Sequence, residues 1–173
     1  FSLKASRFTT SRKVLADAGE SIEKFLTQGL TELGNHLGAI LWQFAPTKKF
    51  DPDDFEGFLK LLPEKQDGLA LKHALEVRHD SFKVPEFAAL ARKYKAAIVY
   101  AEHETYPEIA DVTADFVYAR LQKGSDEVKT CYPPKALDAW AGRLKTWAEG
   151  GEPADLPKID PDSKAGKKGR DVF

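Results

Sequence analysis

Polar side chains interrupt several stretches of this chain that are otherwise apolar. The interrupting residues are Lys4, Gln43, Glu76, Arg78, Tyr118 and Arg120. An unpaired charge costs on the order of several kcal/mol to bury, so such groups are kept where they pair with one another or serve a ligand. The guanidinium group offers a planar fork that matches carboxylate or phosphate oxygens. Because the cations outnumber Glu76, we predict a net-basic site for an anionic or phosphorylated ligand, either a small molecule or a nucleic-acid phosphate.

Each of these residue types suggests a role in such a site. We expect the three cations to hold the anion by charge and hydrogen bonds. Glu76 is the candidate catalytic residue, as a general base or as the group that orients Arg78. Gln43 and Tyr118 would position the ligand through hydrogen bonds. The residues do not specify a reaction; a hydrolase or lyase-type enzyme fits them.

A structural interpretation of the same residues stays open. Glu76 would pair with Arg78 or Arg120 in a network that braces the interior of a non-catalytic binding or scaffold domain. A bound phosphate or sulfate between the two arginines favours the ligand site. Mutual burial of the pair without a cavity favours the scaffold.

A metal site is a further alternative. Glu76, His79, His103 and Glu104 offer ligand types suited to a metal-dependent phosphodiester hydrolase or a nucleic-acid-binding barrel. Their spacing matches no specific metal motif. The sequence also has no phosphate-cradling glycine loop and no nucleophile elbow. We therefore predict neither a metal nor a cofactor.

The elements that must position these side chains alternate along the chain. Strand-like runs lie at residues 1–6, 39–44, 74–79, 97–102 and 115–121. A first helix is expected through residues 22–33, and later helices open at Asp51-Pro52, Val84-Pro85 and Pro133-Pro134. We find no hairpin signal, and single strands that alternate with helices predict parallel pairing through right-handed crossovers. The predicted fold is α/β, a parallel (β/α) TIM-like barrel that is incomplete here, with about five strands.

Side-chain parity predicts where the polar residues lie. Successive side chains of a strand point to opposite faces, so Leu75 and Val77 share one face while Glu76 and Arg78 share the other. The apolar set should contact the helices and the polar set should face the barrel interior. The polar residues lie late in their strands, and active sites of parallel barrels form at that end. We therefore place the site at the C-terminal mouth.

Composition sets further limits. The chain has 173 residues, with 26 Lys and Arg against 27 Asp and Glu, so its overall charge favours no nucleic acid or membrane surface. Its single cysteine, Cys131, excludes an internal disulfide and is typical of the reducing cytoplasm. The chain contains no Met and ends on a strand-like Asp-Val-Phe, so we expect a piece of one barrel domain spanning residues 1–173. Residues 150–170, rich in Pro, Gly and Lys, are expected to form a mobile basic loop within it.

Four runs of the chain resemble the YecE-like domain-of-unknown-function family 72. They are FSLKAS at residues 1–6, LGAILWQFAP at 37–46, LEVRHDSF at 75–82 and ADFVYARL at 114–121. The resemblance covers residues 1–173 and implies a TIM barrel of unassigned activity. This chain would be an internal fragment that holds the third to seventh strands, with Val172 and Phe173 starting the eighth.

The resemblance also bears on the site. It implies that Lys4, Gln43, Glu76, Arg78, Tyr118 and Arg120 match the family's polar residues at strand ends. The chain departs from the family pattern at Phe82, where many members have Trp, and in its lysine-rich loop before the last strand.

Overall fold

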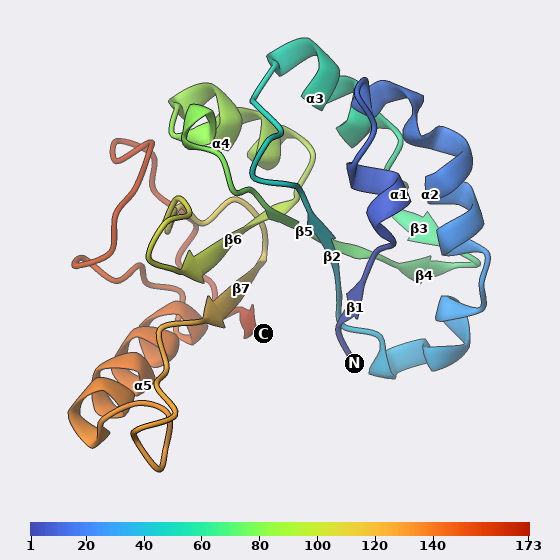
Figure 1. The fold of residues 1–173 in the computed structure, drawn as a ribbon. Coiled ribbons are helices and arrows are strands. Elements are labelled where there is room, and N and C mark those ends of the chain that lie inside the picture. The colour runs from blue at the N-terminus through green and yellow to red at the C-terminus, as the bar shows by residue number, and fades with distance from the viewer.

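A curved, six-stranded parallel sheet forms the centre of the molecule in the computed structural model, which describes residues 1–173 (Figure 1). Its strands are β1 (Leu3–Lys4), β2 (Ala39–Gln43), β5 (Lys72–Glu76), β6 (Ala97–Glu102), β7 (Phe116–Leu121) and β8 (Asp171–Val172). They lie side by side in that order, and every neighbouring pair is parallel. The sheet has the form of a half-barrel. The predicted α/β fold with parallel strands is confirmed, but the sheet has six strands rather than five.

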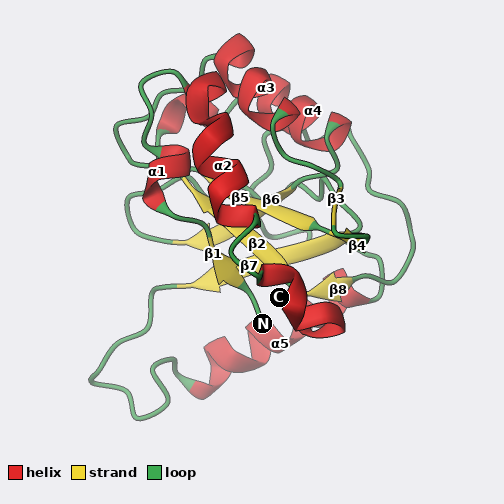
Figure 2. Ribbon diagram, turned by 90° about the vertical axis from the view of Figure 1, so that its right-hand side faces the viewer, coloured by secondary structure: helices red, strands yellow, loops and turns green.

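Helices connect all neighbouring strands of the sheet except β6 and β7, which are joined by a loop, and they cover the outer face of the sheet (Figure 2). They are α1 (Arg7–Thr10), α2 (Gly19–Leu26), α3 (Pro52–Lys60), α4 (Pro85–Lys93) and α5 (Pro134–Ala148), with 3₁₀ turns η1 (Leu15–Ala18), η2 (Leu30–His36) and η3 (Asp80–Phe82). The three proline-marked helix starts are confirmed. At α3, the side chain of Asp51 accepts hydrogen bonds from the backbone N–H groups of Asp53 and Asp54, and Pro52 begins the first turn.

Two local predictions were wrong. The expected helix through residues 22–33 ends at Leu26, because Gly29 adopts a left-handed φ of 85° and the chain continues as η2. A hairpin also exists, formed by β3 (Lys65–Gln66) and β4 (Leu69–Ala70). Its turn residues Asp67 and Gly68 both have positive φ, 48° and 81°. Asp-Gly is a usual signal for such a two-residue turn, so the sequence did contain the signal that predicts this hairpin.

The two faces of the sheet have different cores. The outer face packs against α2, α3 and α4 in a cluster of 21 buried residues that includes Trp42, Leu75 and Phe87. A second outer cluster places Trp140 and Trp147 of α5 against β6 and β7. The inner face carries only six buried apolar residues, Ala39, Leu41, Ala74, Ala97, Val99 and Phe116. The alternation predicted from parity therefore holds, with the larger apolar set toward the helices.

Polar contacts attach the segment after α5 to the outer layer and join parts of the segment to each other. The buried carboxylate of Asp111 accepts hydrogen bonds from the backbone N–H groups of Ile159 and Asp160, at 2.8 and 3.1 Å. Arg92 reaches the carboxylate of Asp160 at 2.5 Å. Arg170 donates to three backbone carbonyl groups of residues 150, 151 and 166. None of the helices has the length and apolar character needed to span a membrane.

Candidate functional site

Polar side chains from separate strands meet at the carboxyl ends of those strands. Gln43 and Glu76 end β2 and β5 and are direct partners in the parallel ladder. Arg120 is the penultimate residue of β7, and Lys4 ends β1. Arg78 follows β5 by two residues, which returns its side chain to the face of Glu76. We call these five residues the rim cluster, because parallel pairing brings them to one rim of the half-barrel.

Glu76 is the centre of the rim cluster. Glu76 is fully buried, with 0% of its surface exposed. Its two carboxylate oxygens accept from Gln43 Nε2, each at 3.0 Å. Oε1 also accepts from Nε of Arg78 at 2.9 Å and forms an ion pair with its Nη2 at 2.7 Å, and Oε2 accepts from Nη1 of Arg120 at 2.6 Å. Burial alone raises the pKa of Glu76, but the hydrogen bonds from Gln43, Arg120 and Arg78 outweigh it and leave the pKa below its ordinary value.

The two arginines of the rim cluster keep donors that no protein atom uses. Arg120 donates to protein only through Nη1, so its Nε and Nη2 are free. Arg78 donates to Glu76 through Nε and has Nη2 in ion-pair contact with it, which leaves Nη1 free. The side chains of Arg120 and Arg78 are 31% and 20% exposed, so both guanidinium groups border solvent. This arrangement can accept the oxygens of an anion without breaking any bond to Glu76.

Gln43 links the third cation to the others. Its Nε2 must face Glu76, because a carboxylate only accepts hydrogen bonds. Its Oε1 therefore points away, and accepts from Nζ of exposed Lys4 at 3.3 Å. The rim cluster thus holds three cations and one buried carboxylate, so it has an excess of positive charge.

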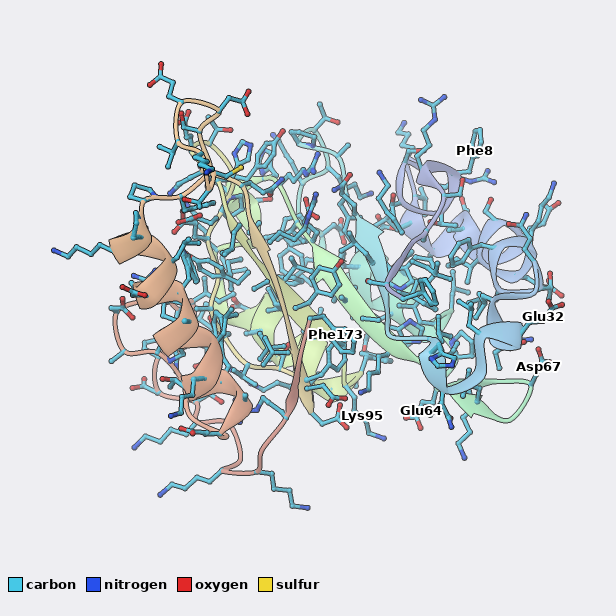
Figure 3. All side chains as sticks on the ribbon, turned by 90° about the horizontal axis from the view of Figure 1, so that it is seen from below. Phe8, Glu32, Glu64, Asp67, Lys95 and Phe173 are labelled. Atoms are coloured by element: carbon cyan, nitrogen blue, oxygen red, sulfur yellow. The ribbon has the colours of Figure 1, made fainter.

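Tyr118, the remaining predicted site residue, lies one layer deeper. It precedes Arg120 by two residues and shares the inner face. Its hydroxyl is 3.1 Å from Oγ of Ser2, and its ring stacks on Phe173 at 6.4 Å between centroids (Phe173 is labelled in Figure 3). Tyr118 forms no hydrogen bond with the rim cluster. The structure therefore brings five of the predicted residues together, and Tyr118 lies below them on the inner face of the sheet.

One aromatic residue at the rim was missed by the sequence reasoning. Cζ of Arg78 lies 4.8 Å from the ring centroid of Tyr106, which follows β6. His103 stacks on the same tyrosine, with centroids 3.9 Å apart and planes at 14°. The sequence interpretation considered this loop only for metal ligands. Its position just after the carboxyl end of a strand was the signal that would have included Tyr106.

The residues of the metal alternative do not converge. No three His, Cys, Asp or Glu side chains lie close enough together to hold an ion. Nδ1 of His79 contacts Oγ of Ser81 at 2.8 Å, and Nδ1 of His103 accepts from the backbone N–H of Thr105 at 3.1 Å. Glu102 accepts a hydrogen bond from the hydroxyl of Tyr132, and no hydrogen bond or ion pair joins its carboxylate to the rim cluster.

Comparison with known proteins identifies relatives of this fold. The model of a family described as "Protein of unknown function DUF72" matches residues 1–167. A DUF72 family protein from Thermotoga maritima has 22% identity and a TM-score of 0.61, over 81% of this chain. A DUF72 family protein from Enterococcus faecalis has 15% identity and a TM-score of 0.59, over 100% of this chain and 70% of its own length. The chain spans 58% of the length of the Thermotoga protein. No protein with a curated function matches.

Proposed function

Since the chain belongs to the DUF72 family of proteins of unknown function, we propose its function from its own geometry: the rim cluster binds an anionic, phosphorylated or carboxylated ligand. One observation carries this proposal. A single buried carboxylate holds two guanidinium groups whose remaining N–H groups face solvent at the rim, with a third cation beside them.

The charge balance favours a ligand over a purely structural network. A closed network needs about as many anions as cations, because each unneutralised charge near the interior carries a desolvation cost. The rim cluster contains Lys4, Arg78 and Arg120 against Glu76 alone. An anionic group at the rim would complete both the charge balance and the hydrogen bonding of the guanidinium groups.

We assign Glu76 the orienting role rather than that of a general base. A base must accept a proton, and all hydrogen-bonding positions of this carboxylate are directed at nitrogen donors. Its lowered pKa also disfavours proton uptake near neutral pH. If the bound ligand reacts as in a hydrolase or lyase, another group transfers the proton.

We also propose that the sheet is part of one closed (β/α) barrel domain with the rim cluster at its C-terminal mouth. Parallel strands in sequential order, helices on the outer face and longer relatives of similar fold support this. Further strands would then border the ligand from the side opposite to β5.

Calorimetric titration of the protein with inorganic phosphate measures its phosphate affinity and tests the proposed site. Arg120→Gln removes one guanidinium, and charge-assisted hydrogen bonds of about 1.5–3 kcal/mol correspond to an affinity loss of about tenfold or more. Arg143→Gln is the matched control, because Arg143 has a similar side-chain exposure of 25% but pairs with Asp155 near α5. We expect the control to bind as the wild type does.

The scaffold alternative makes the opposite prediction. A folded wild-type protein that binds neither phosphate nor sulfate, or an Arg120→Gln variant with unchanged affinity, would remove the ligand site and leave a structural network.

A further inference from the structure

The guanidinium group of Arg78 is held on one edge and on one face. Along its Nε and Nη2 edge, Nε donates to Oε1 of Glu76 and Nη2 lies 2.7 Å from the same oxygen. Its Cζ lies over the ring of Tyr106, 4.8 Å from the ring centroid. A planar guanidinium has one further edge with two nitrogens, formed by Nη1 and Nη2. That edge has no second protein partner.

We infer that Tyr106 is a positioning residue of the rim site, which fixes the plane of Arg78 so that its free edge meets two oxygens of one ligand group. The inference rests on the proposed anion site and adds the geometry of recognition. Arg78 lies beyond the last residue of β5, so no ladder restrains its backbone. Glu76 holds one edge but leaves rotation about that edge open, and contact with an aromatic face removes this freedom.

Tyr106 can act as a rigid support because its own loop is fixed on both sides. His103 stacks on one face at 3.9 Å, which leaves only the opposite face for Arg78. Nδ1 of His103 accepts from the backbone N–H of Thr105 at 3.1 Å. On the other side, Glu108 accepts from the hydroxyl of Tyr100 at 2.9 Å and from Nζ of Lys123 at 2.5 Å. The stack of three side chains therefore joins the loop after β6 to the loop after β5.

The arrangement predicts which anions the site prefers. A fork of two nitrogens in a fixed plane matches paired oxygens of a phosphate or carboxylate group, whereas a spherical halide contacts a fork no better than it contacts an ammonium group. The ligand group is therefore an oxyanion with at least two accessible oxygens. Phosphate, acetate and chloride serve as probes that separate phosphate, carboxylate and simple charge.

The test measures phosphate affinity in variants of Tyr106 and Arg78 in the full chain. Tyr106→Phe keeps the ring and should bind within about twofold of wild type, whereas Tyr106→Leu loses the cation–π contact and should bind about fivefold more weakly. Chloride affinity should not change in either variant. Tyr94→Leu is the control. Nζ of Lys93 lies over the ring of Tyr94, 5.5 Å from its centroid, but this cation–π contact is at the end of α4.

A double-mutant cycle separates positioning from a general structural effect. If Tyr106 acts through Arg78, Tyr106→Leu should cause no further loss in an Arg78→Lys background. An equal loss in both backgrounds, or a Tyr106→Leu variant that binds phosphate as wild type does, overturns the inference and leaves the rim site standing. A wild type that binds no phosphate overturns the rim site itself, and the role of Tyr106 with it.

Discussion

Two buried titratable residues of strand β5 face opposite sides of the sheet, and they are satisfied in opposite ways. His73 faces the helices and has one donor and one acceptor partner: Nδ1 accepts from Nε1 of Trp42 at 3.1 Å, and Nε2 lies 2.8 Å from the carbonyl oxygen of Pro63. Glu76, three residues later, faces the inner rim and is charged, with more cationic donors around it than it can use.

The difference indicates what each face contributes. The His73 network is neutral and closed, so it adds to stability and offers nothing to a ligand. The Glu76 network is charged and open, since its guanidinium groups retain free N–H groups at solvent. Of these two residues, the one on the helix-covered face therefore supports the core, while the one on the inner face belongs to the candidate site.

Removal of the central charge should have the largest effect. In Glu76→Gln the guanidinium groups of Arg78 and Arg120 lose their anion, and breaking a buried ion pair costs about 3–5 kcal/mol of unfolding free energy. Urea denaturation measures this loss. We also expect sulfate to stabilise the variant more than the wild type, because the ion replaces the missing carboxylate.

A surface carboxylate provides the comparison for that experiment. Glu56 forms ion pairs with Lys60 and Lys93 on helices α3 and α4, and Glu56→Gln should cause no comparable loss. If Glu76→Gln is as stable as Glu56→Gln, the contrast between the two faces is wrong.

The closed network on the outer face should respond more weakly. His73→Leu introduces an apolar side chain and leaves the indole N–H of Trp42 and the carbonyl of Pro63 without partners. Each unsatisfied buried group costs on the order of 1–3 kcal/mol, part of which the added apolar contact offsets, so we expect a loss of about 2 kcal/mol by urea denaturation. Phosphate affinity at the rim should stay at the wild-type value. A loss of phosphate affinity together with the loss of stability would show that the two faces are coupled.

The pH dependence of stability gives the smallest expected effect. Burial lowers the pKa of His73 below 6.5, and the hydrogen bond to Pro63 offsets this only in part. The unfolded chain therefore takes up a proton near pH 6.5 while the folded chain does not. The contribution of neutral His73 is complete above that pH and is lost as the pH falls below it.

A variant without the imidazole isolates this contribution. His73→Gln retains a donor and an acceptor but does not titrate, so its stability should fall less than that of the wild type between about pH 7.5 and pH 5. Glu76 acts in a separate, lower window: its lowered pKa means that its contribution is lost only as the pH falls below 4.5. Parallel stability curves for the two proteins above pH 5 would contradict the assignment to His73.

The sequence by itself determined the class of fold and the face on which each strand residue lies. Strand side chains alternate with a period of two, so the apolar partners Leu75 and Val77 already placed Glu76 on the other face. Prolines marked the starts of α3, α4 and α5 for equally local reasons, together with the capping residue Asp51 at α3. The Asp67-Gly68 turn was just as local a signal, and its omission was an error of interpretation.

Only the tertiary structure decided which of the polar residues meet. Tyr118 and Arg120 share a face, yet two residues of separation place them in different layers, and only Arg120 reaches Glu76. Tyr106 approaches Arg78 because the loops after β5 and β6 lie side by side, a contact between residues 28 positions apart. The alternation of side chains is a property of one strand, so the sequence of that strand reveals it. Ladder register and loop packing depend on the neighbouring strands, and these decide which residues contact Arg78.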